Sequence, residues 1–348
     1  DVVCIDPIGT GFSRSHEPKK DGEDKKPSRF WEVERDLTSI GEAMHRLLSR
    51  WGRWSSPVSI AGESYGGFRV ARMAKLLPEK FGIGLRAAIL ISPGIELSGL
   101  VTSDYNLEHW LELFPSFAAT AHVHHRAGTD VSAQVHRQRA ERFASQDWIR
   151  LLVQGDAMDA AEKQRIHREA GELLGLDPSL IEGTNGRVGR ELFCRELLRD
   201  QRRYVGFYDG AVTNIDPFPD RASYDGPDRT LFGLAPTFTA GIERVLRDEL
   251  GVKTDLMYEM INIEANESWK DSGQPHFIAV VGTSMDALRY GMALDPDMDV
   301  VICHGHYDLV TPYSSADRLV RAMKLHPSQR ERLHVEHYPG GHMFYSHA

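Results

Sequence analysis

One serine of the chain stands in the pattern that nucleophilic serines of hydrolases occupy. The letters GESYG at positions 62–66 match G-x-S-x-G, and no other segment of the 348 residues does. An apolar strand pattern precedes the match and a helical pattern follows it, which is the setting of a nucleophile elbow: glycines permit a strained turn, and a helix N-terminus favours developing negative charge. Because so short a pattern also arises by chance at an ordinary strand–turn–helix junction, the flanking elements decide the interpretation. The sequence therefore predicts that Ser64 is a nucleophile.

A nucleophilic serine requires a base, and the base requires an orienting carboxylate. In α/β-hydrolases the chain order is Ser, then Asp or Glu, then His, with both partners in loops after later strands. The strand pattern DVVICHG runs into HYDLVTP, which places Asp308 in such a loop, and RLHVEHY runs into PGGHMFY, which places His342 in the next. Asp209 is the rival acid, but it lies in a region of helical patterns. We therefore predict Ser64, Asp308 and His342 as a catalytic triad.

The sequence has 16 histidines, so His342 needs a reason to be preferred. It alone follows a strand pattern through two glycines, an approach flexible enough for an imidazole to reach over the edge of a sheet. The group His122, His124 and His125 suggests metal binding, but no ordered carboxylate partner is apparent for it. We expect neither a metal nor another cofactor.

The elements that must position these side chains alternate between strand and helix in the N-terminal part. Such alternation predicts an α/β fold, in which crossover helices join the strands of a mostly parallel sheet. The apolar patterns predict strands at 1–6, 57–62 and 86–92, and helices at 30–52 (ended by Gly52) and 67–82.

The pattern changes in the middle of the chain, where strand patterns are few and amphipathic helical patterns dominate. Strand and helix patterns resume near the C-terminal end. We expect the α/β core to be interrupted by a helical lid, as residues 1–100 (core, first part), 101–275 (lid) and 276–348 (core, second part). Helices are predicted at 132–155, 158–176, 191–206, 238–251 and 314–326, with a helix start at Asp177-Pro178, and strands at 299–305 and 332–338.

Charge and composition exclude several classes of partner. The net charge is −9 and the sequence pI is about 6.0, which argues against nucleic acid because phosphate binding needs clustered Lys and Arg. The run from Lys19 to Arg29 mixes both signs and is interpreted as a solvated loop. No apolar stretch approaches the ~18 residues of a membrane span. The cysteines at 4, 194 and 303 are too far apart for a zinc motif or a disulfide framework, and those at 4 and 303 are expected in the core.

Four sequence blocks together resemble the serine carboxypeptidase family, the S10 type of α/β-hydrolase. They are DPIGTGFSRS, GESYGG, HYDLVTP and PGGHMFY, in this order, and the resemblance covers nearly the whole chain. The YDLVTP variant and the lack of the lid's usual cysteine bridges look more like the bacterial branch of the family. The resemblance implies an α/β-hydrolase core with a helical lid, an acyl-enzyme mechanism, and a peptide with a free C-terminus as substrate.

The resemblance also implies roles for two residues beside the nucleophile. The backbone N–H of Tyr65 matches the first oxyanion donor, and Glu63 matches the residue that helps to hold the C-terminal carboxylate of the substrate. The Glu63 carboxylate and the terminal carboxylate of the substrate would then lie side by side. Two such groups must share one proton, and the apparent pKa for the loss of this proton is raised. A competing interpretation makes Glu63 a residue that only supports the turn.

Gly9 and Gly11 open the chain in a glycine-rich turn. A dinucleotide fingerprint would need a third glycine, and a phosphate loop would need a Lys, so we interpret the pair as a wall of the substrate cleft. The family's second oxyanion donor comes from an Asn-Gly-Gly-Pro-Gly loop that does not occur here. We therefore expect this chain to be truncated at both ends, with that loop upstream of Asp1. A signal peptide further upstream would make the protein periplasmic or secreted. Without such a peptide the protein would be cytoplasmic.

Two other functions fit the same residues. An esterase or acyltransferase would use the same triad with a different acceptor. A non-catalytic binding protein of this fold would keep the fold and lack the reaction. The preferred C-terminal residue and the oligomeric state do not follow from the sequence.

Overall fold

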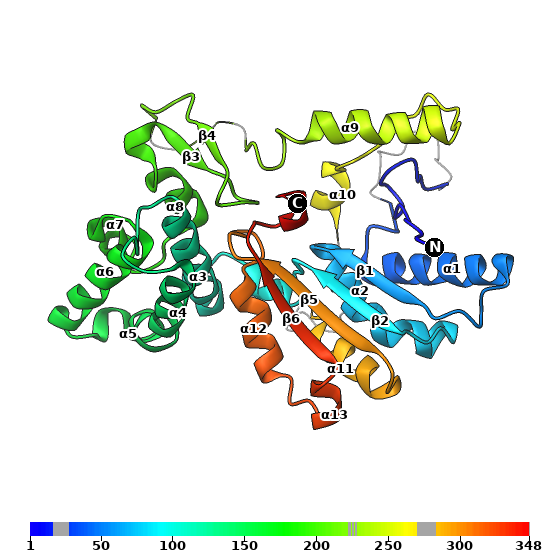
Figure 1. The fold of residues 1–348 in the computed structure, drawn as a ribbon, viewed down its shortest axis with the longest axis horizontal. Helices are drawn as coiled ribbons and strands as arrows, with labels where there is room; N and C mark the ends of the chain where they lie inside the picture. Colours follow the sequence, from blue (N-terminus) through cyan, green and yellow to red (C-terminus); the bar gives the residue numbers. More distant parts are fainter. Residues whose placement is uncertain (17–27, 222–223, 225, 227, 270–282, 348) are drawn as a thin grey trace.

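A computed structural model describes residues 1–16, 28–221, 224, 226, 228–269 and 283–347. Its centre is a parallel sheet of four strands in the order β1-β2-β5-β6 (Figure 1). Because all four strands run the same way, their carboxyl ends meet at one edge of the sheet. The strand predictions from residue 57 onward are confirmed. The strands are β1 (Ser59–Glu63), β2 (Ala87–Ile91), β5 (Asp299–Gly305) and β6 (Leu333–Tyr338).

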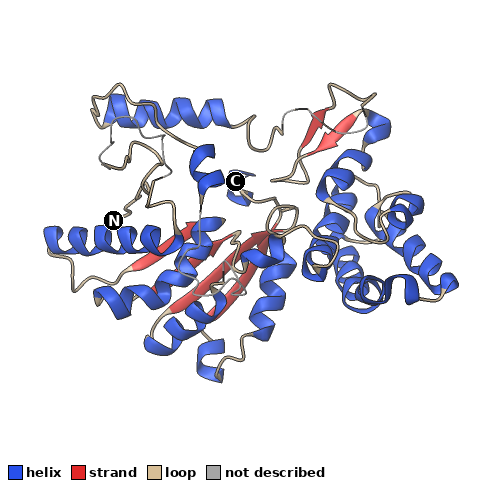
Figure 2. Ribbon diagram, turned by 180° about the vertical axis from the view of Figure 1, so that it is seen from behind, coloured by secondary structure: helices blue, strands red, loops and turns tan. Residues whose placement is uncertain are grey.

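Helices cover the sheet through an apolar core (Figure 2). α2 packs on β1, on β2 and on α11, and α12 contacts β5 and β6. The predicted end of the first helix at Gly52 is confirmed, since Gly52 adopts the left-handed conformation with φ +61°. The structure is thus a mixed α/β fold. These helices are α1 (Val33–Trp51), α2 (Tyr65–Leu76), α11 (Met285–Leu294) and α12 (Tyr313–Ala322), with the short α13 (Pro327–Arg330) before β6.

The middle of the chain forms a second group of helices with its own apolar core, to one side of the sheet (Figure 1). The predicted helix start is confirmed: the Asp177 side chain accepts a hydrogen bond from the Ser179 N–H at 2.8 Å. The expected helix at 191–206 is only partly right. It ends early, and Arg202 turns the chain at φ +54° into an antiparallel pair of short strands. The elements are α3 (Leu107–Val123), α4 (Ala133–Phe143), α5 (Ile149–Gln154), α6 (Ala160–Leu174), α7 (Pro178–Gly183), α8 (Arg190–Glu196), β3 (Arg203–Val205) and β4 (Thr213–Ile215).

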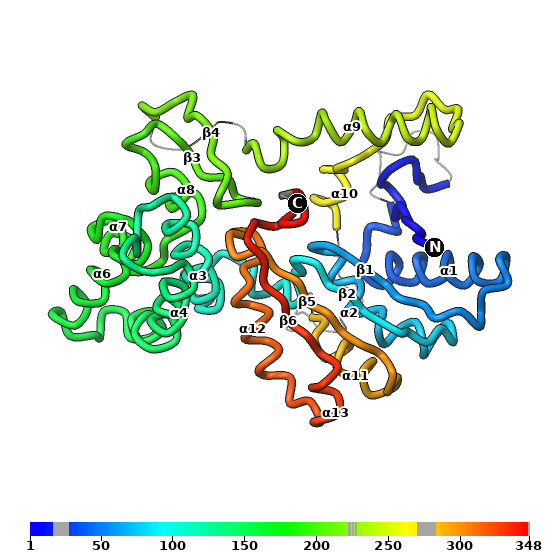
Figure 3. Tube along the Cα trace, viewed as in Figure 1, coloured from blue at the N-terminus to red at the C-terminus, as the bar shows by residue number. Residues whose placement is uncertain are grey.

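Two further helices lie near the carboxyl edge of the sheet (Figure 3). They are α9 (Ala235–Glu243), which continues as a wider helical turn to Glu249, and α10 (Ile263–Ser268). α9 has no buried residue. Among the described residues, no helix is both long enough and apolar enough to cross a membrane.

The expected strand at residues 1–6 is wrong. The segment is irregular, Val2 is 92% exposed, and Cys4 is also exposed rather than in the core. A strand needs a neighbour to bond its N–H and C=O groups, and among the described strands β1 borders only β2. Residues 19–27 of the charged run and the expected boundary at 275–276 lie outside the described residues.

Four of the described helices were not predicted: α3, α10, α11 and α13. α3 is buried on almost all sides, so its apolar residues show no one-sided helical spacing that would distinguish the element. This explains why a helix at the centre of the second core left little signal in the sequence.

Candidate active site

Ser64 sits at the abrupt turn between β1 and α2. Its backbone has φ 57° and ψ −118°, a conformation that is costly for a residue other than glycine. The turn is possible because Gly62 has no side chain: a Cβ there would lie 2.2 Å from the carbonyl oxygen of Gly66. The Ser64 N–H donates to the Ile91 carbonyl at 2.9 Å, which ties the turn to the end of β2. The serine is therefore held at the carboxyl edge of the sheet in a strained geometry.

Asp308 and His342 form a buried hydrogen-bonded pair at the same edge. Asp308 follows β5 and is 0% exposed, and His342 follows β6 and is 3% exposed. His342 Nδ1 lies 2.7 Å from Asp308 Oδ2. The other carboxylate oxygen, Oδ1, accepts the N–H groups of Val310 at 2.8 Å and Thr311 at 2.9 Å. The loop thus fixes the carboxylate, and the carboxylate fixes the imidazole.

Two residues that the sequence analysis did not single out complete this network. Thr311 Oγ1 lies 2.8 Å from Asp308 Oδ2 and 2.9 Å from the Ser92 carbonyl oxygen. The Ser92 hydroxyl in turn donates to the His342 carbonyl at 2.7 Å. Ser92 directly follows β2 and is fully buried. A polar residue just past a buried strand was the available signal for Ser92, and the spacing Asp-x-x-Thr was the signal for Thr311.

The electrostatics of His342 suit a general base. Burial alone would lower the pKa of His342, but the charge of Asp308, the hydrogen bond to Asp308 and the charge of Glu63 together raise that pKa above its usual value. Both carboxylates favour the imidazolium, the form that a general base adopts when it has taken a proton.

Glu63, the last residue of β1, has a partner from the C-terminal end of the chain. The Tyr345 hydroxyl donates to Glu63 Oε2 at 2.6 Å. Tyr345 lies in a short 3₁₀ turn, Phe344–His347, that follows the His342 loop. Glu63 is therefore linked to His342 by charge and to the His342 loop by a hydrogen bond.

Tyr65 is the first residue of α2, so its backbone N–H lies at the positive end of a helix. Its side chain is held by neighbours: the Trp269 indole N–H donates to the Tyr65 hydroxyl at 2.9 Å, and Arg69 lies over the ring at 4.8 Å from its centroid. These two contacts fix the Tyr65 side chain, which directly follows Ser64.

Ser64 and the Asp308–His342 pair stand at the ends of neighbouring elements of one sheet. The residue that accepts the Ser64 N–H, Ile91, directly precedes Ser92, which binds the His342 carbonyl. Ser64 and the Asp308–His342 pair thus share one edge of the sheet. Among the hydrogen bonds of the described residues, none joins the Ser64 hydroxyl to His342.

Asp209, the rival acid, lies beside the His342 loop but does not orient His342. A Cβ at Gly341 would lie 2.4 Å from Asp209 Cα, so the two loops touch. The Asp209 side chain accepts the Ala211 N–H at 2.8 Å, and the neighbouring Tyr208 carbonyl accepts the His342 N–H. The helical region therefore contacts the candidate site through its backbone, while the imidazole pairs with Asp308.

Gly9 and Gly11 are positioned by contacts of their own. Both have positive φ, and a Cβ would lie 2.6 Å from Trp31 Nε1 at Gly9 and 1.9 Å from Asp6 Oδ2 at Gly11. The Gly11 backbone forms an isolated bridge with Glu259. These contacts explain the glycines by close packing, and none of them involves the Ser64 turn or the hydrogen-bonded pair.

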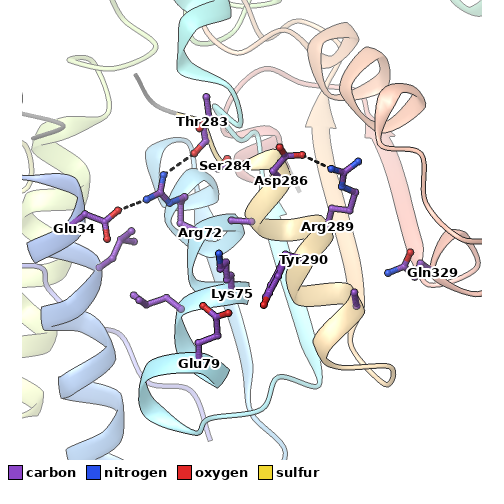
Figure 4. Close-up of a pocket in the computed structure, with 14 residues that line it drawn as sticks. Glu34, Arg72, Lys75, Glu79, Thr283, Ser284, Asp286, Arg289, Tyr290 and Gln329 are labelled. Atoms are coloured by element: carbon purple, nitrogen blue, oxygen red, sulfur yellow. Dashed lines mark hydrogen bonds and ion pairs between the residues drawn. The ribbon is translucent and has the colours of Figure 1, made fainter. Parts of the chain in front are cut away.

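A pocket of about 720 Å³ lies away from this site, between α2 and α11 (Figure 4). Two ion pairs lie in its wall, Arg72 with Glu34 and Arg289 with Asp286. None of Ser64, Asp308 and His342 lines it. Within the part of the chain that the structure describes, no three His, Cys, Asp or Glu side chains are grouped so that they could hold a metal ion.

Comparison of the chain with protein-family models, with curated proteins and with solved structures gives no match in any of the three.

Proposed function

We propose that the protein is a serine hydrolase that releases C-terminal amino acids from peptides through an acyl-enzyme. The observation that carries the proposal is the buried pair of His342 Nδ1 and Asp308 Oδ2, 2.7 Å apart, at the sheet edge where Ser64 stands in a strained turn. A serine on such a turn, with a carboxylate-oriented imidazole from later loops, is the arrangement of α/β-hydrolases. The helical region would then be the lid of such an enzyme.

In the proposed reaction Ser64 attacks the carbonyl carbon of the last peptide bond. His342 Nε2 takes the hydroxyl proton and passes it to the leaving nitrogen, and Asp308 holds the ring and stabilises the imidazolium. Water then repeats the sequence on the ester and regenerates Ser64. The Tyr65 N–H, at the start of α2, faces the developing oxyanion. Catalytic hydrogen bonds are often long without substrate and tighten in the complex, so Ser64 and His342 would close on substrate binding.

Glu63 supports the choice of a carboxypeptidase among serine hydrolases. It stands next to Ser64, and its charge acts on His342, the group that must protonate the leaving amine. A terminal carboxylate bound there would share a proton with Glu63, so binding would weaken as the pH rises and this proton leaves.

Two measurements test the proposal. A fluorophosphonate probe should label the protein, and Ser64→Ala should abolish labelling. A blocked dipeptide with a free C-terminus should be cleaved with a higher kcat/KM than its C-terminal amide, with a ratio that falls as the pH rises. Labelling without this preference would favour an esterase or acyltransferase, and absence of labelling would favour a non-catalytic binding protein.

A further inference from the structure

Tyr345 places a phenol beside Glu63, next to the candidate site. It lies three residues after His342 and donates to Glu63 Oε2 at 2.6 Å. The Tyr345 residue is 47% exposed, so the pair borders solvent rather than the core. No resemblance or motif assigned a role to this residue.

Tyr345 and Glu63 differ in how they would interact with an anionic ligand. Burial, then the hydrogen bond to Glu63 and the charge of Glu63, raise the pKa of Tyr345, so the phenol is a proton donor at neutral pH. Glu63 would repel an anionic ligand unless a proton lies between them. Tyr345 would instead donate to an anionic oxygen without any change of charge.

We propose that Tyr345 determines specificity by donating a hydrogen bond to the terminal carboxylate of the leaving amino acid, beside Glu63. This inference rests on the proposed carboxypeptidase function. His342 hands its proton to the leaving nitrogen, and the turn that carries Tyr345 continues directly from the His342 loop. On binding, the phenol would exchange the Glu63 carboxylate for the substrate carboxylate as its acceptor. No covalent bond changes, and the hydrogen bond is conserved.

The test is Tyr345→Phe, assayed on a blocked dipeptide acid and on its amide. Because the phenol exchanges one carboxylate acceptor for another, the variant loses only the difference between two hydrogen bonds, so the preference for the acid should fall about fivefold, mainly through a higher KM. The matched control is Tyr338→Phe, which removes a hydroxyl from a tyrosine that is 39% exposed and stacks on Phe344 at 4.7 Å. The control should keep the preference.

Three outcomes would overturn the inference. If Tyr345→Phe keeps the wild-type preference, Tyr345 does not bind the carboxylate, while the proposed function stands. If the variant loses acid and amide activity equally and its pH profile moves for both substrates, Tyr345 only positions Glu63. If the wild type labels at Ser64 but does not distinguish acid from amide, the proposed function fails together with the inference.

Discussion

His342 Nδ1 pairs with Asp308 although Asp209, from the helical region, packs against the same loop. The sequence favoured Asp308 over Asp209, and in the structure it is Asp308 that pairs with His342. Asp308 is held by two backbone N–H groups and by Thr311, so its position does not depend on the histidine.

The first prediction concerns these two acids. Asp308→Asn should keep the fold's shape but present an amide N–H to His342 Nδ1, which favours the wrong tautomer. We expect kcat to fall about 10⁴-fold. Asp209→Asn retains a side chain that can accept the Ala211 N–H and should change kcat only a few-fold. Steady-state assays give kcat for both variants. An equal loss of kcat in the two variants would show that Asp209 also takes part in catalysis.

The second prediction uses the two glycines of the G-x-S-x-G match. Gly62→Ala would drive a Cβ into the Gly66 carbonyl, 2.2 Å away, so the Ser64 turn must shift. We expect labelling by a fluorophosphonate to be lost and unfolding free energy to drop by about 1–3 kcal/mol. A Cβ at Gly66 meets nothing within 4 Å.

Gly66→Ala is therefore the matched control. It should label normally and gain up to about 1 kcal/mol of stability, because alanine is the better helix former. Labelling rates and urea unfolding of both variants provide the measurement. Similar behaviour of the two variants would show that the close approach at Gly62 does not shape the turn.

The third prediction concerns the pH dependence of the proposed base. The charge of Glu63 contributes to the raised pKa of His342, although burial opposes it. Glu63→Gln removes that charge, so the pKa of His342 should fall and the base form should persist to lower pH. The acid limb of kcat/KM for an amide or ester substrate should therefore move to lower pH.

Glu336→Gln, a change at an exposed position of β6, serves as the control and should leave the acid limb in place. A shift to higher pH in Glu63→Gln would contradict the assigned sign. The substrate must lack a free carboxylate, so that loss of carboxylate binding does not enter the profile.

The fourth prediction concerns stability. His304 in β5 is 0% exposed, and neither of its ring nitrogens has a hydrogen-bond partner. Burial is the main cause that lowers the pKa of His304 to about 4. Between this value and the ordinary 6.5, the unfolded chain binds the proton and the folded protein does not, so stability falls as the pH falls. The loss by pH 4 should be on the order of 3 kcal/mol.

His304→Leu removes this titration and should make the decline of unfolding free energy between pH 7 and pH 4.5 less steep, while His306, whose pKa burial lowers to about 3, keeps its own contribution. His334→Leu, at an exposed position of β6, should leave the decline unchanged. Urea unfolding at several pH values compares the slopes. A wild-type slope in His304→Leu would mean that other groups cause the acid sensitivity.

The strands that carry the candidate site were predictable because each is an apolar run that ends in a polar loop. This local signal located Ser64, Asp308 and His342 at the ends of β1, β5 and β6. The same signal failed at residues 1–6, because an apolar run becomes a strand only when a neighbouring strand bonds its backbone. The sequence shows the apolar run, but it does not show whether a neighbouring strand lies beside it.

Local pattern by itself thus determined the alternation of strand and helix, the strained position of Ser64, and the order of the three candidate residues. The sequence favoured Asp308 over Asp209 by its setting, and the tertiary structure showed the contact itself, because the imidazole could be reached from two loops that are distant in sequence. The tertiary structure also brought Ser92, Thr311 and Tyr345 into the site, through contacts that join different strand ends. Such contacts depend on how parallel strands are ordered in the sheet, and the spacing of residues along the chain does not record that order.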